Sequence, residues 1–392
     1  MIKLSFLGDL TCDRPFLQAA KCSKKVYRFS GAFQSAKAFL ASSDYIVGNL
    51  ETTFSGSKVP YNKGLHYNTP DSFLQELSSC GVDLLTTANN HCFDGGLKGL
   101  TRTLELLQAA GIAHTGTFIT EDSPRYYLHT ISGIRFAFFS YTYSVNKYAD
   151  VKIPTTIQKH VNLLRPCPPM ALRYRILGRL FPLDIRRRLK IILKKPTISA
   201  YSDRIHPHTI SQPYLDRIKE EIAEARAKSD IIVFCIHIGG QFNETPGEYS
   251  EYMMNFLKEN GVDIVIGHHP HTIQKTRISE NTQVCAYSLG SFSLSPSAIY
   301  IHHECKPEYS QVLHVYIDED TKIIRRVTFS FLKIVEDDRA FLSVIPVDEL
   351  YENAQDAEKA SLLEDISCLY ERITGHSLPQ DGILREYPLF SS

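Results

Sequence analysis

The sequence predicts an α/β layered fold, because short apolar runs typical of buried strands alternate with segments of helical periodicity. Glycines at three joints between a helix and the next strand support this class, at Gly81, Gly111 and Gly261. A glycine there can adopt the left-handed conformation that ends a helix. Composition agrees, since 43% of the 392 residues are hydrophobic and 22% are charged, which suits a large buried core.

Elements in the first part of the chain follow this alternation. The expected strands, each a short apolar run, are residues 2–7, 45–48, 82–88, 126–130 and 134–141. The expected helices are residues 32–40, 70–79 and 97–110. Residues 53–68 show neither pattern and are predicted to form a surface loop.

The alternation resumes in the second half of the chain. Further expected elements are helices at 213–228, 249–259 and 356–374, and strands at 230–236, 262–266 and 283–287. Two longer alternating runs, 313–317 and 326–331, are separated by a turn and predict a β-hairpin. We therefore expect one domain over residues 1–335 and a C-terminal helical appendage over 336–392.

A proline-rich basic segment interrupts the domain at about residues 147–205 and is interpreted as an insertion. Between Arg165 and Lys195 many basic residues face a single acid, Asp184. The structural interpretation is a solvated lid or a helical pair that covers the core. The alternative is peripheral contact of residues 165–195 with anionic lipid, a polyanionic polymer or an acidic partner, because cations interleaved with apolar residues suit such surfaces.

Overall charge and cysteine usage exclude several classes of function. Lys plus Arg and Asp plus Glu number 43 each, which argues against a chain-wide nucleic-acid surface, and no nucleic-acid partner is expected. The nine cysteines form no Cys-x-x-Cys pair, which disfavours zinc ribbons and thioredoxin chemistry and suits a reducing cytoplasm. Few apolar residues precede Asp9, too few for a signal peptide. We expect a cytoplasmic protein. The basic segment suggests an alternative, a peripheral position at the inner face of the membrane.

Polar side chains gather where the expected strands end. In α/β folds, ligands bind outside the carboxyl ends of the strands, so residues at these ends are candidates for one shared site. The candidates are Asp9, Glu51, Asn90, His91, His237, His269 and His271. Histidines two apart in an extended segment, as in His269-Pro270-His271, point the same way.

These residue types form an oxygen and nitrogen donor set without a thiolate, which suits Mn²⁺, Fe²⁺ or Zn²⁺. The set exceeds what one tetrahedral ion needs, so one or two divalent ions are expected, with a carboxylate bridging a pair. Each residue also has an ordinary structural interpretation. Asp9 and Asp94 could be helix N-caps, Glu51 a surface acid and His237 a core histidine.

Six short motifs in order resemble the CapA family of capsule and poly-gamma-glutamate synthesis proteins, a branch of the calcineurin-like metallophosphoesterase superfamily. The resemblance covers roughly residues 1–300. Its motifs are Gly8-Asp9 with Arg14, Asn49-Leu50-Glu51, Asn89-Asn90-His91-x-x-Asp94, His237-x-Gly239, Gly267-x-His269-Pro270-His271 and Tyr287-Ser-Leu-Gly. The fold that it implies has two stacked mixed β-sheets flanked by helices, with metals at the strand ends.

The resemblance also implies a division of metal ligands. Asp9 and His271 would hold the first ion, and Glu51 would bridge both ions. The second ion would be held by Asn90, His237 and His269. These assignments are carried over from the superfamily onto matching positions of this chain.

The implied catalytic pair is His91, as proton donor or transition-state stabiliser, and Asp94, which would orient it. Asn89 and Arg14 would position the substrate. The activity implied is that of a metal-dependent hydrolase in which a metal-activated water attacks a phosphoester, or with less support an amide or gamma-glutamyl bond. The substrate would be a cell-surface polymer or its precursor.

The chain departs from the family pattern at three motifs, and the departure at Thr11 favours a rival function. The superfamily's Asp-x-His becomes Asp9-Leu10-Thr11, so one imidazole is missing from the first metal site. Gln241 and Ser291 also replace the usual Glu and Asn. The rival is a non-catalytic assembly or binding subunit of a capsule-synthesis complex, whereas the retained His91 and Asp94 favour the enzyme. A nucleic-acid phosphodiesterase is a weaker third candidate.

Overall fold

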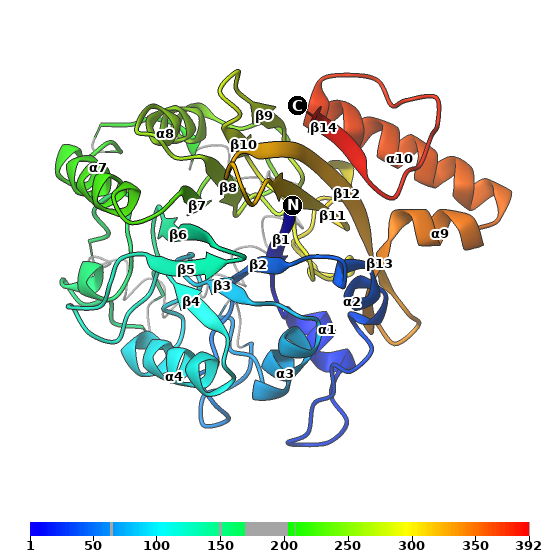
Figure 1. Ribbon diagram of the computed structural model, residues 1–392. Coiled ribbons are helices and arrows are strands. Elements are labelled where there is room, and N and C mark those ends of the chain that lie inside the picture. The colour runs from blue at the N-terminus through cyan, green and yellow to red at the C-terminus, as the bar shows by residue number, and fades with distance from the viewer. Residues whose placement is uncertain (63–65, 149–150, 169–202, 208, 392) are drawn as a thin grey trace.

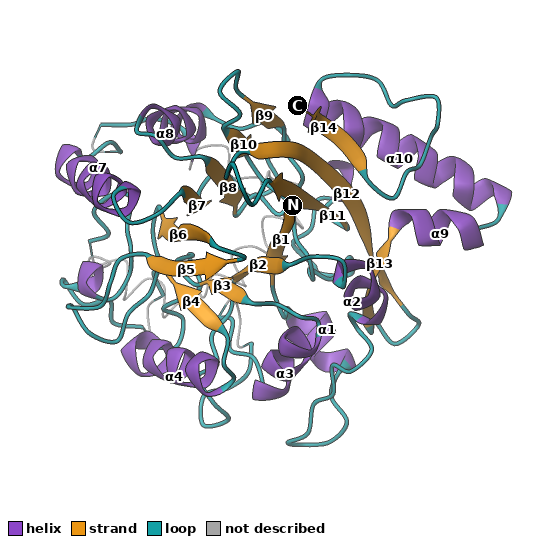
Figure 2. Cartoon of the chain, in the orientation of Figure 1, coloured by secondary structure: helices purple, strands orange, loops and turns teal. Residues whose placement is uncertain are grey.

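The computed structural model describes residues 1–62, 66–148, 151–168, 203–207 and 209–391, and it shows two stacked mixed β-sheets flanked by helices (Figure 1). Outer helices pack on both sides of the pair of sheets, as the helix and strand colouring of Figure 2 makes plain. This arrangement confirms the predicted α/β layered fold. Among the described residues, no helix is both long and apolar enough to cross a membrane.

The first sheet has eight strands, seven of them in the order β13-β12-β11-β1-β2-β3-β4, and β14 pairs with β12. Its strands are β1 (Ile2–Leu10), β2 (Tyr45–Leu50), β3 (Leu84–Thr86), β4 (Ala113–Thr115), β11 (Tyr309–Ile317), β12 (Ile324–Glu336), β13 (Leu342–Pro346) and β14 (Tyr387–Ser391). Strands β1 to β4 are parallel, whereas β11 pairs antiparallel with β1. The parallel half therefore brings four carboxyl ends to one edge.

The second sheet has six strands in the order β5-β6-β7-β8-β10-β9. They are β5 (Tyr127–Ile131), β6 (Ile134–Thr142), β7 (Ile231–His237), β8 (Ile264–His268), β9 (Thr276–Ile278) and β10 (Val284–Ala286). Strands β6, β7, β8 and β10 are parallel, and β5 and β9 run antiparallel at the two ends.

Helices cover the outer faces of both sheets. On the first sheet lie α1 (Arg14–Ala19), α2 (Gln34–Leu40), α3 (Asp71–Ser79) and α4 (Gly96–Ala109). On the second lie α7 (Gln212–Arg226) and α8 (Glu248–Glu259). The glycines that follow α3, α4 and α8 all have positive φ, at 87°, 71° and 83°, as the helix-ending role requires. Short 3-10 helices among the described residues include η1 (Ile157–Lys159) and η3 (His303–Cys305).

Apolar side chains of β1 face two different hydrophobic cores. Leu4 and Phe6 of β1 point between the sheets, where they meet Phe136 and Phe138 of β6. Leu7 and Leu10 of β1 instead join the core beneath α1 to α4. Both faces of β1 are therefore buried, which fixes the register of the strand that carries Asp9.

Residues 336–392, expected as a helical appendage, contribute β13 and β14 to the first sheet in addition to α9 (Val347–Asn353) and α10 (Asp356–Thr374). Leu369, Tyr370 and Ile373 of α10 are buried in the central core, where Phe329 of β12 also lies. The predicted hairpin is confirmed as β11 and β12. Most of the basic segment, residues 169–195, lies outside the described residues, so its predicted surface contact stays a prediction.

Candidate metal centre

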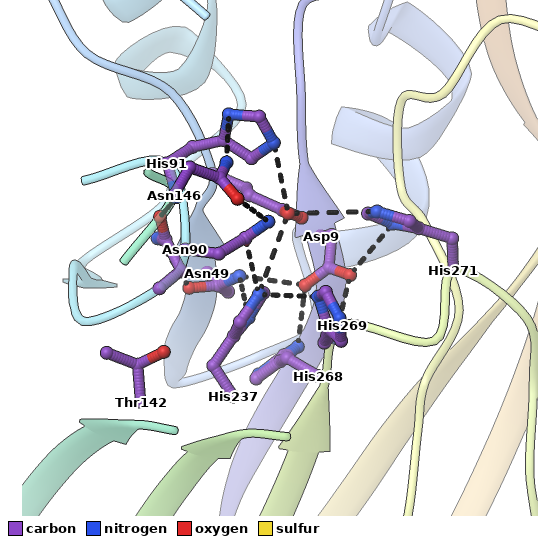
Figure 3. A network of polar contacts seen from close by, with 12 residues as sticks. Asp9, Asn49, Asn90, His91, Thr142, Asn146, His237, His268, His269 and His271 are labelled. Atoms are coloured by element: carbon purple, nitrogen blue, oxygen red, sulfur yellow. Dashed lines mark hydrogen bonds and ion pairs between the residues drawn. The ribbon is translucent and has the colours of Figure 1, made fainter. Parts of the chain in front are cut away.

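Side chains from both sheets converge at the carboxyl edge (Figure 3). Asp9 comes from β1 and Glu51 follows β2 in the first sheet, whereas His237 ends β7 in the second. His269 and His271 follow β8, and all five side chains are at most 3% exposed. The structure therefore brings these five sequence-predicted residues together at one place.

The five residues form two groups that could each hold a metal ion. Asp9, Glu51 and His271 make one group, and Glu51, His237 and His269 make the other. Within each group the candidate ligand atoms lie within 4.8 Å of one another. Glu51 belongs to both groups and stands between them.

The Glu51 carboxylate is fully buried, and neither of its oxygens has a hydrogen-bond partner among the described residues. Its Oε1 lies 3.6 Å from His237 Nε2 and 3.7 Å from His271 Nε2. Two ligands of one ion with bonds of about 2.1 Å stand roughly 3–3.5 Å apart, so these separations suit a shared cation. Burial, and then the charge of Asp9, raise the pKa of Glu51 well above its usual range. An unpaired buried carboxyl is costly, and a bound cation would remove that cost.

Asp9 has the opposite electrostatic setting. Its Oδ2 lies 3.1 Å from His271 Nδ1, its Oδ1 lies 3.2 Å from His268 Nδ1, and Asn49 Nδ2 donates to Oδ1 at 2.8 Å. Burial alone would raise the pKa of this carboxyl, but the two imidazoles outweigh burial and hold it well below its usual range. Asp9 is therefore the ionised carboxylate of the site.

The histidines of the second group are held as neutral rings, the form that binds metals. His237 Nε2 lies 2.8 Å from Asn90 Oδ1 and 3.1 Å from His269 Nδ1, so three candidate ligand atoms face one point. Burial and the neighbouring His269 hold the pKa of His237 well below its usual range. Burial and His271 lower the pKa of His269 to about 3. Tyr143 OH lies 3.3 Å from His269 Nε2 and steadies the far side of that ring.

The loop after β8 reaches the site by a different conformation from the one expected. His269 and His271 have φ of 99° and 56°, so the segment is not extended and the expected two-residue alternation does not apply. The rings still converge because the backbone turns: His269 N donates to Asp9 Oδ2 at 3.2 Å, and Pro270 O accepts from Phe242 N at 2.7 Å. The prediction that the two side chains point the same way from an extended segment is therefore wrong, although both rings reach the site.

His91 forms a pair with Asp94 beside the two groups. His91 Nδ1 and Asp94 Oδ2 lie 2.6 Å apart, and the same oxygen accepts from Tyr67 N at 2.7 Å. The Tyr67 ring stacks on the imidazole with centroids 4.2 Å apart. His91 Nε2 is thereby aimed at the centre, 4.0 Å from Glu51 Oε1.

Asn89 and Arg14, the candidate substrate residues, occupy different settings. Asn89 is buried: its Nδ2 donates to Leu50 O at 2.7 Å, and its Oδ1 accepts from His91 N at 3.1 Å. It therefore ties the end of β2 to the segment that carries His91. Arg14 is the exposed first residue of α1 and lies outside the buried cluster. Substrate contact by either residue stays a prediction.

The structural alternatives for Asp9, Asp94 and Glu51 are wrong, whereas that for His237, a buried ring with polar partners, is not contradicted. Asp9 lies inside β1, and the N-cap of α1 is Asp13, which accepts from Phe16 N. The N-cap of α4 is Gly95, without a side-chain bond, so Asp94 is not a cap. Glu51 is fully buried rather than a surface acid.

Alternate residues of two segments pair with one another beside the site, in an arrangement that we call the ladder. Asp9, Thr11 and Asp13 lie opposite Ser291, Ser293 and Ser295. Asp9 is held by backbone bonds, from its N to Gly290 O at 3.0 Å and to its O from Phe292 N at 2.8 Å. Thr11 Oγ1 donates to Ser293 O at 3.1 Å, so this side chain is used in the ladder. The approach is close: a Cβ at Gly8 would lie 2.4 Å from Gly290 O.

Sequence reasoning missed four residues that shape the site. They are Asn49, Tyr67, Asn146 and His268: Asn49 and His268 lie within motifs, whereas Tyr67 lies in the expected loop 53–68 and Asn146 follows β6, where no sequence signal marked them. Asn146 N donates to Asn90 O at 2.7 Å, and its Nδ2 lies 3.3 Å from His91 Nδ1. The loop after β6 therefore joins the two groups to the His91 pair.

Comparison with known proteins gives one family. The model of the family described as "Bacterial capsule synthesis protein PGA_cap" matches residues 3–295. The PGA biosynthesis protein CapA of Bacillus subtilis (strain 168) is 23% identical over 299 residues, which are 74% of this chain and 63% of that protein. The capsule biosynthesis protein CapA of Bacillus anthracis is 22% identical over 296 residues, 74% of this chain and 59% of that one.

The chain thus spans about three fifths of the length of these curated relatives. A solved structure, TT1561 of Thermus thermophilus, aligns over 83% of this chain and 97% of that chain with 9% identity and a TM-score of 0.35, too low to support an argument. The match to the family model covers most of the chain and includes every candidate ligand of the metal centre. The chain belongs to the PGA_cap family of bacterial capsule synthesis proteins.

Proposed function

We propose that this protein is a metal-dependent hydrolase of phosphoester bonds that acts in the synthesis or processing of a capsule, poly-gamma-glutamate or another cell-surface polymer. The observation that supports this most is the Glu51 carboxylate, which is buried without a hydrogen-bond partner in the described chain and belongs to both ligand groups. A bridging carboxylate between two ligand sets is the arrangement of two-metal hydrolytic sites.

The residues present fit one or two divalent ions. Asp9 and His271 would hold one ion, Asn90, His237 and His269 would hold the other, and Glu51 would serve both. When bound, such ions polarise a phosphoryl oxygen and lower the pKa of a water molecule. The nitrogen and oxygen donors favour manganese, iron or zinc.

His91 supplies the group that a purely structural metal site does not need. Asp94 accepts from Nδ1 and Tyr67 covers the ring face, so rotation of the imidazole is restricted. Nε2 then faces the space beside Glu51, where a leaving oxygen can receive its proton. Asp94 acts as the positioning residue of this pair.

The family points to a polymer or its precursor as the substrate and to other capsule-synthesis proteins as partners. Phosphoester cleavage is the reaction that two ligand groups at this spacing suit best. An amide or gamma-glutamyl bond is the second choice of scissile bond. An anionic surface would meet the basic residues 165–195.

A second candidate is a non-catalytic assembly subunit, and the setting of Thr11 favours it. Thr11 stands where the superfamily has an imidazole, and its hydroxyl is committed to Ser293 O. The group of Asp9, Glu51 and His271 therefore has no fourth protein ligand at that position. An assembly subunit would bind one ion and would not need the proton of His91.

The test combines metal content with turnover. We expect chelator-free protein reconstituted with Mn²⁺ or Zn²⁺ to bind two ions per chain and to cleave phosphodiester model substrates. His91→Ala should lose about 10²–10⁴-fold in kcat while it keeps its metal. The control is His376→Ala, an exposed histidine beyond α10, which should match the wild type.

Two results would reject the hydrolase. Full activity in His91→Ala would remove the proposed proton donor. One bound ion with no turnover on phosphoesters or gamma-glutamyl polymers would favour the assembly subunit.

A further inference from the structure

Arg372, in the last turn of α10, links three loops, two of which follow strands that end at the metal centre. Its side chain is 11% exposed although it carries a full charge. The three loops follow β7, follow β8 and contain η3. The C-terminal helix therefore reaches the site through one guanidinium.

The contacts of Arg372 are specific to each loop. Nη1 donates to Thr272 Oγ1 at 3.1 Å and to Cys305 O at 3.0 Å, and Nη2 pairs with Glu244. Thr272 Oγ1 in turn donates to Cys305 O at 2.6 Å. The planar guanidinium supplies several donors in fixed directions, which a lysine cannot do.

The loop after β8 needs such support. His269 and His271, one from each ligand group, adopt left-handed φ values that residues with a side chain rarely adopt. Such conformations persist only where the surrounding structure holds them. Thr272 directly follows His271, so the contacts of Arg372 begin one residue from a candidate ligand.

The helix that carries Arg372 is itself firmly placed. Leu369 and Ile373, on either side of Arg372, are at most 1% exposed in the central core. Asp365, two turns earlier, accepts from Tyr309 OH at 2.6 Å and pairs with Lys306. Because α10 is fixed to the sheet, Arg372 can transmit that rigidity to the loops.

We infer that Arg372 is a positioning residue of the metal centre, and that α10 holds the His269-Pro270-His271 loop in its ligating form. This inference rests on the proposed function for the identity of the bound metal, but not for the bracing of the loops. It assigns to residues beyond the matched segment 3–295 a part in building the site.

The first experiment uses metal-free protein and measures amide hydrogen exchange. Arg372→Ala should speed exchange in peptides that cover 240–244 and 269–274; peptides over 302–306 are left out of the comparison because Lys306 also pairs with Asp365. The matched control is Asp365→Ala, which removes another polar anchor of α10 but leaves the contacts of Arg372 in place. Unchanged exchange in Arg372→Ala, or equal acceleration in Asp365→Ala, would overturn the inference whether or not metal binds.

The second experiment titrates the same proteins with Mn²⁺. Loss of a residue that orients metal ligands typically weakens metal affinity about 10–100-fold, and we expect this for Arg372→Ala. Asp365→Ala should bind as the wild type does. Added guanidinium ion at millimolar concentration should restore part of the affinity of Arg372→Ala, since it can re-enter the vacated site.

The outcomes separate the two proposals. A wild type that binds no Mn²⁺ would reject the metal centre, while the exchange comparison would still decide the bracing. Wild-type affinity in Arg372→Ala would overturn the positioning role alone. If Arg372→Ala fails to fold, Arg372→Lys keeps the charge without the fork and should show the same loss in smaller degree.

Discussion

Two buried carboxyl groups in the first part of the chain, those of Asp13 and Glu51, differ in their hydrogen bonding. Asp13 is fully buried and accepts three hydrogen bonds, from Phe16 N at 3.2 Å, Ser295 N at 2.8 Å and Ser295 Oγ at 2.6 Å. Glu51 is equally buried and, within the described part of the chain, accepts none. Burial raises the pKa of both, to about 6 for Asp13, where the Ser295 bonds oppose burial, and well above the usual range for Glu51.

The difference distinguishes a structural carboxylate, Asp13, from a candidate ligand, Glu51. The fold places hydrogen-bond donors at both oxygens of the buried Asp13 carboxylate, so burial alone does not leave a carboxylate of this chain without donors. Leaving Glu51 without donors, among imidazoles 3.6–4.0 Å away, suits a group whose partner is a cation. Substitutions that keep size and remove charge can test this distinction.

The largest effect is expected for Glu51→Gln. Loss of the shared ligand should weaken metal affinity by about 100-fold or more, beyond the range for outer residues. The metal-free variant should be at least as stable as metal-free wild type, because the substitution removes a buried carboxyl that has no hydrogen-bond partner among the described residues. Calorimetry with and without Mn²⁺ measures both quantities. Metal at 100 times its Kd should stabilise the wild type by about 2.7 kcal/mol and the variant hardly at all.

His314 is the imidazole counterpart of Asp13, because it is buried with complete hydrogen bonding and lies outside both ligand groups. This ring is fully buried between Ser5 Oγ at 2.8 Å and Ser330 Oγ at 3.2 Å, so its hydrogen bonding is complete. Burial, reinforced by Lys3, lowers the pKa of His314 to about 3. In the unfolded chain this imidazole takes up a proton near pH 6.5, whereas in the folded chain it stays neutral until about pH 3. Its contribution to the free energy of unfolding is therefore complete above pH 6.5 and is lost as the pH falls toward 3.

Urea unfolding of His314→Gln between pH 7 and pH 4 tests that setting. As the pH falls over this range, the free energy of unfolding should decrease by up to about 3 kcal/mol less in the variant than in the wild type. Its metal affinity should not change, because His314 belongs to neither ligand group. Equal pH dependence in the two proteins would show that the buried imidazole titrates normally.

The smallest effect is expected for Asp13→Asn. An amide nitrogen cannot accept from the Ser295 donors, and an unmet buried donor costs about 1–3 kcal/mol. Stability should fall by this amount with or without metal, while Mn²⁺ affinity stays close to that of the wild type. A loss of metal binding without a loss of stability would reverse the distinction between the two carboxyls.

The sequence was sufficient for the fold class and for the convergence of the ligands. Apolar runs ending at Asp9, Asn49-Leu50-Glu51 and His237 predict both parallel strands and the edge at which their ends meet. Local pattern carries this information because a buried parallel strand has few alternatives to an apolar run.

Contacts between residues that are distant in the sequence could not be predicted from local sequence patterns. Nothing near Thr11 reveals Ser293, although Ser291, Ser293 and Ser295 do recur with a spacing of two. Arg372 lies in a charged helix where it resembles any exposed cation, and only packing shows that its side chain is nearly buried. The positive φ of His269 was also hidden, because tertiary contacts impose it on a residue that does not prefer it.

The ladder between residues 9–13 and 291–295 has a consequence for biosynthesis. The segment that holds the backbone of the candidate ligand Asp9 lies 282 positions later in the chain. At about 5–20 residues per second, the two halves of the ladder are made roughly 15–60 s apart. Asp9 therefore lacks these native backbone partners during that interval, and a metal ion can enter the finished centre only after residues 291–295 have been made.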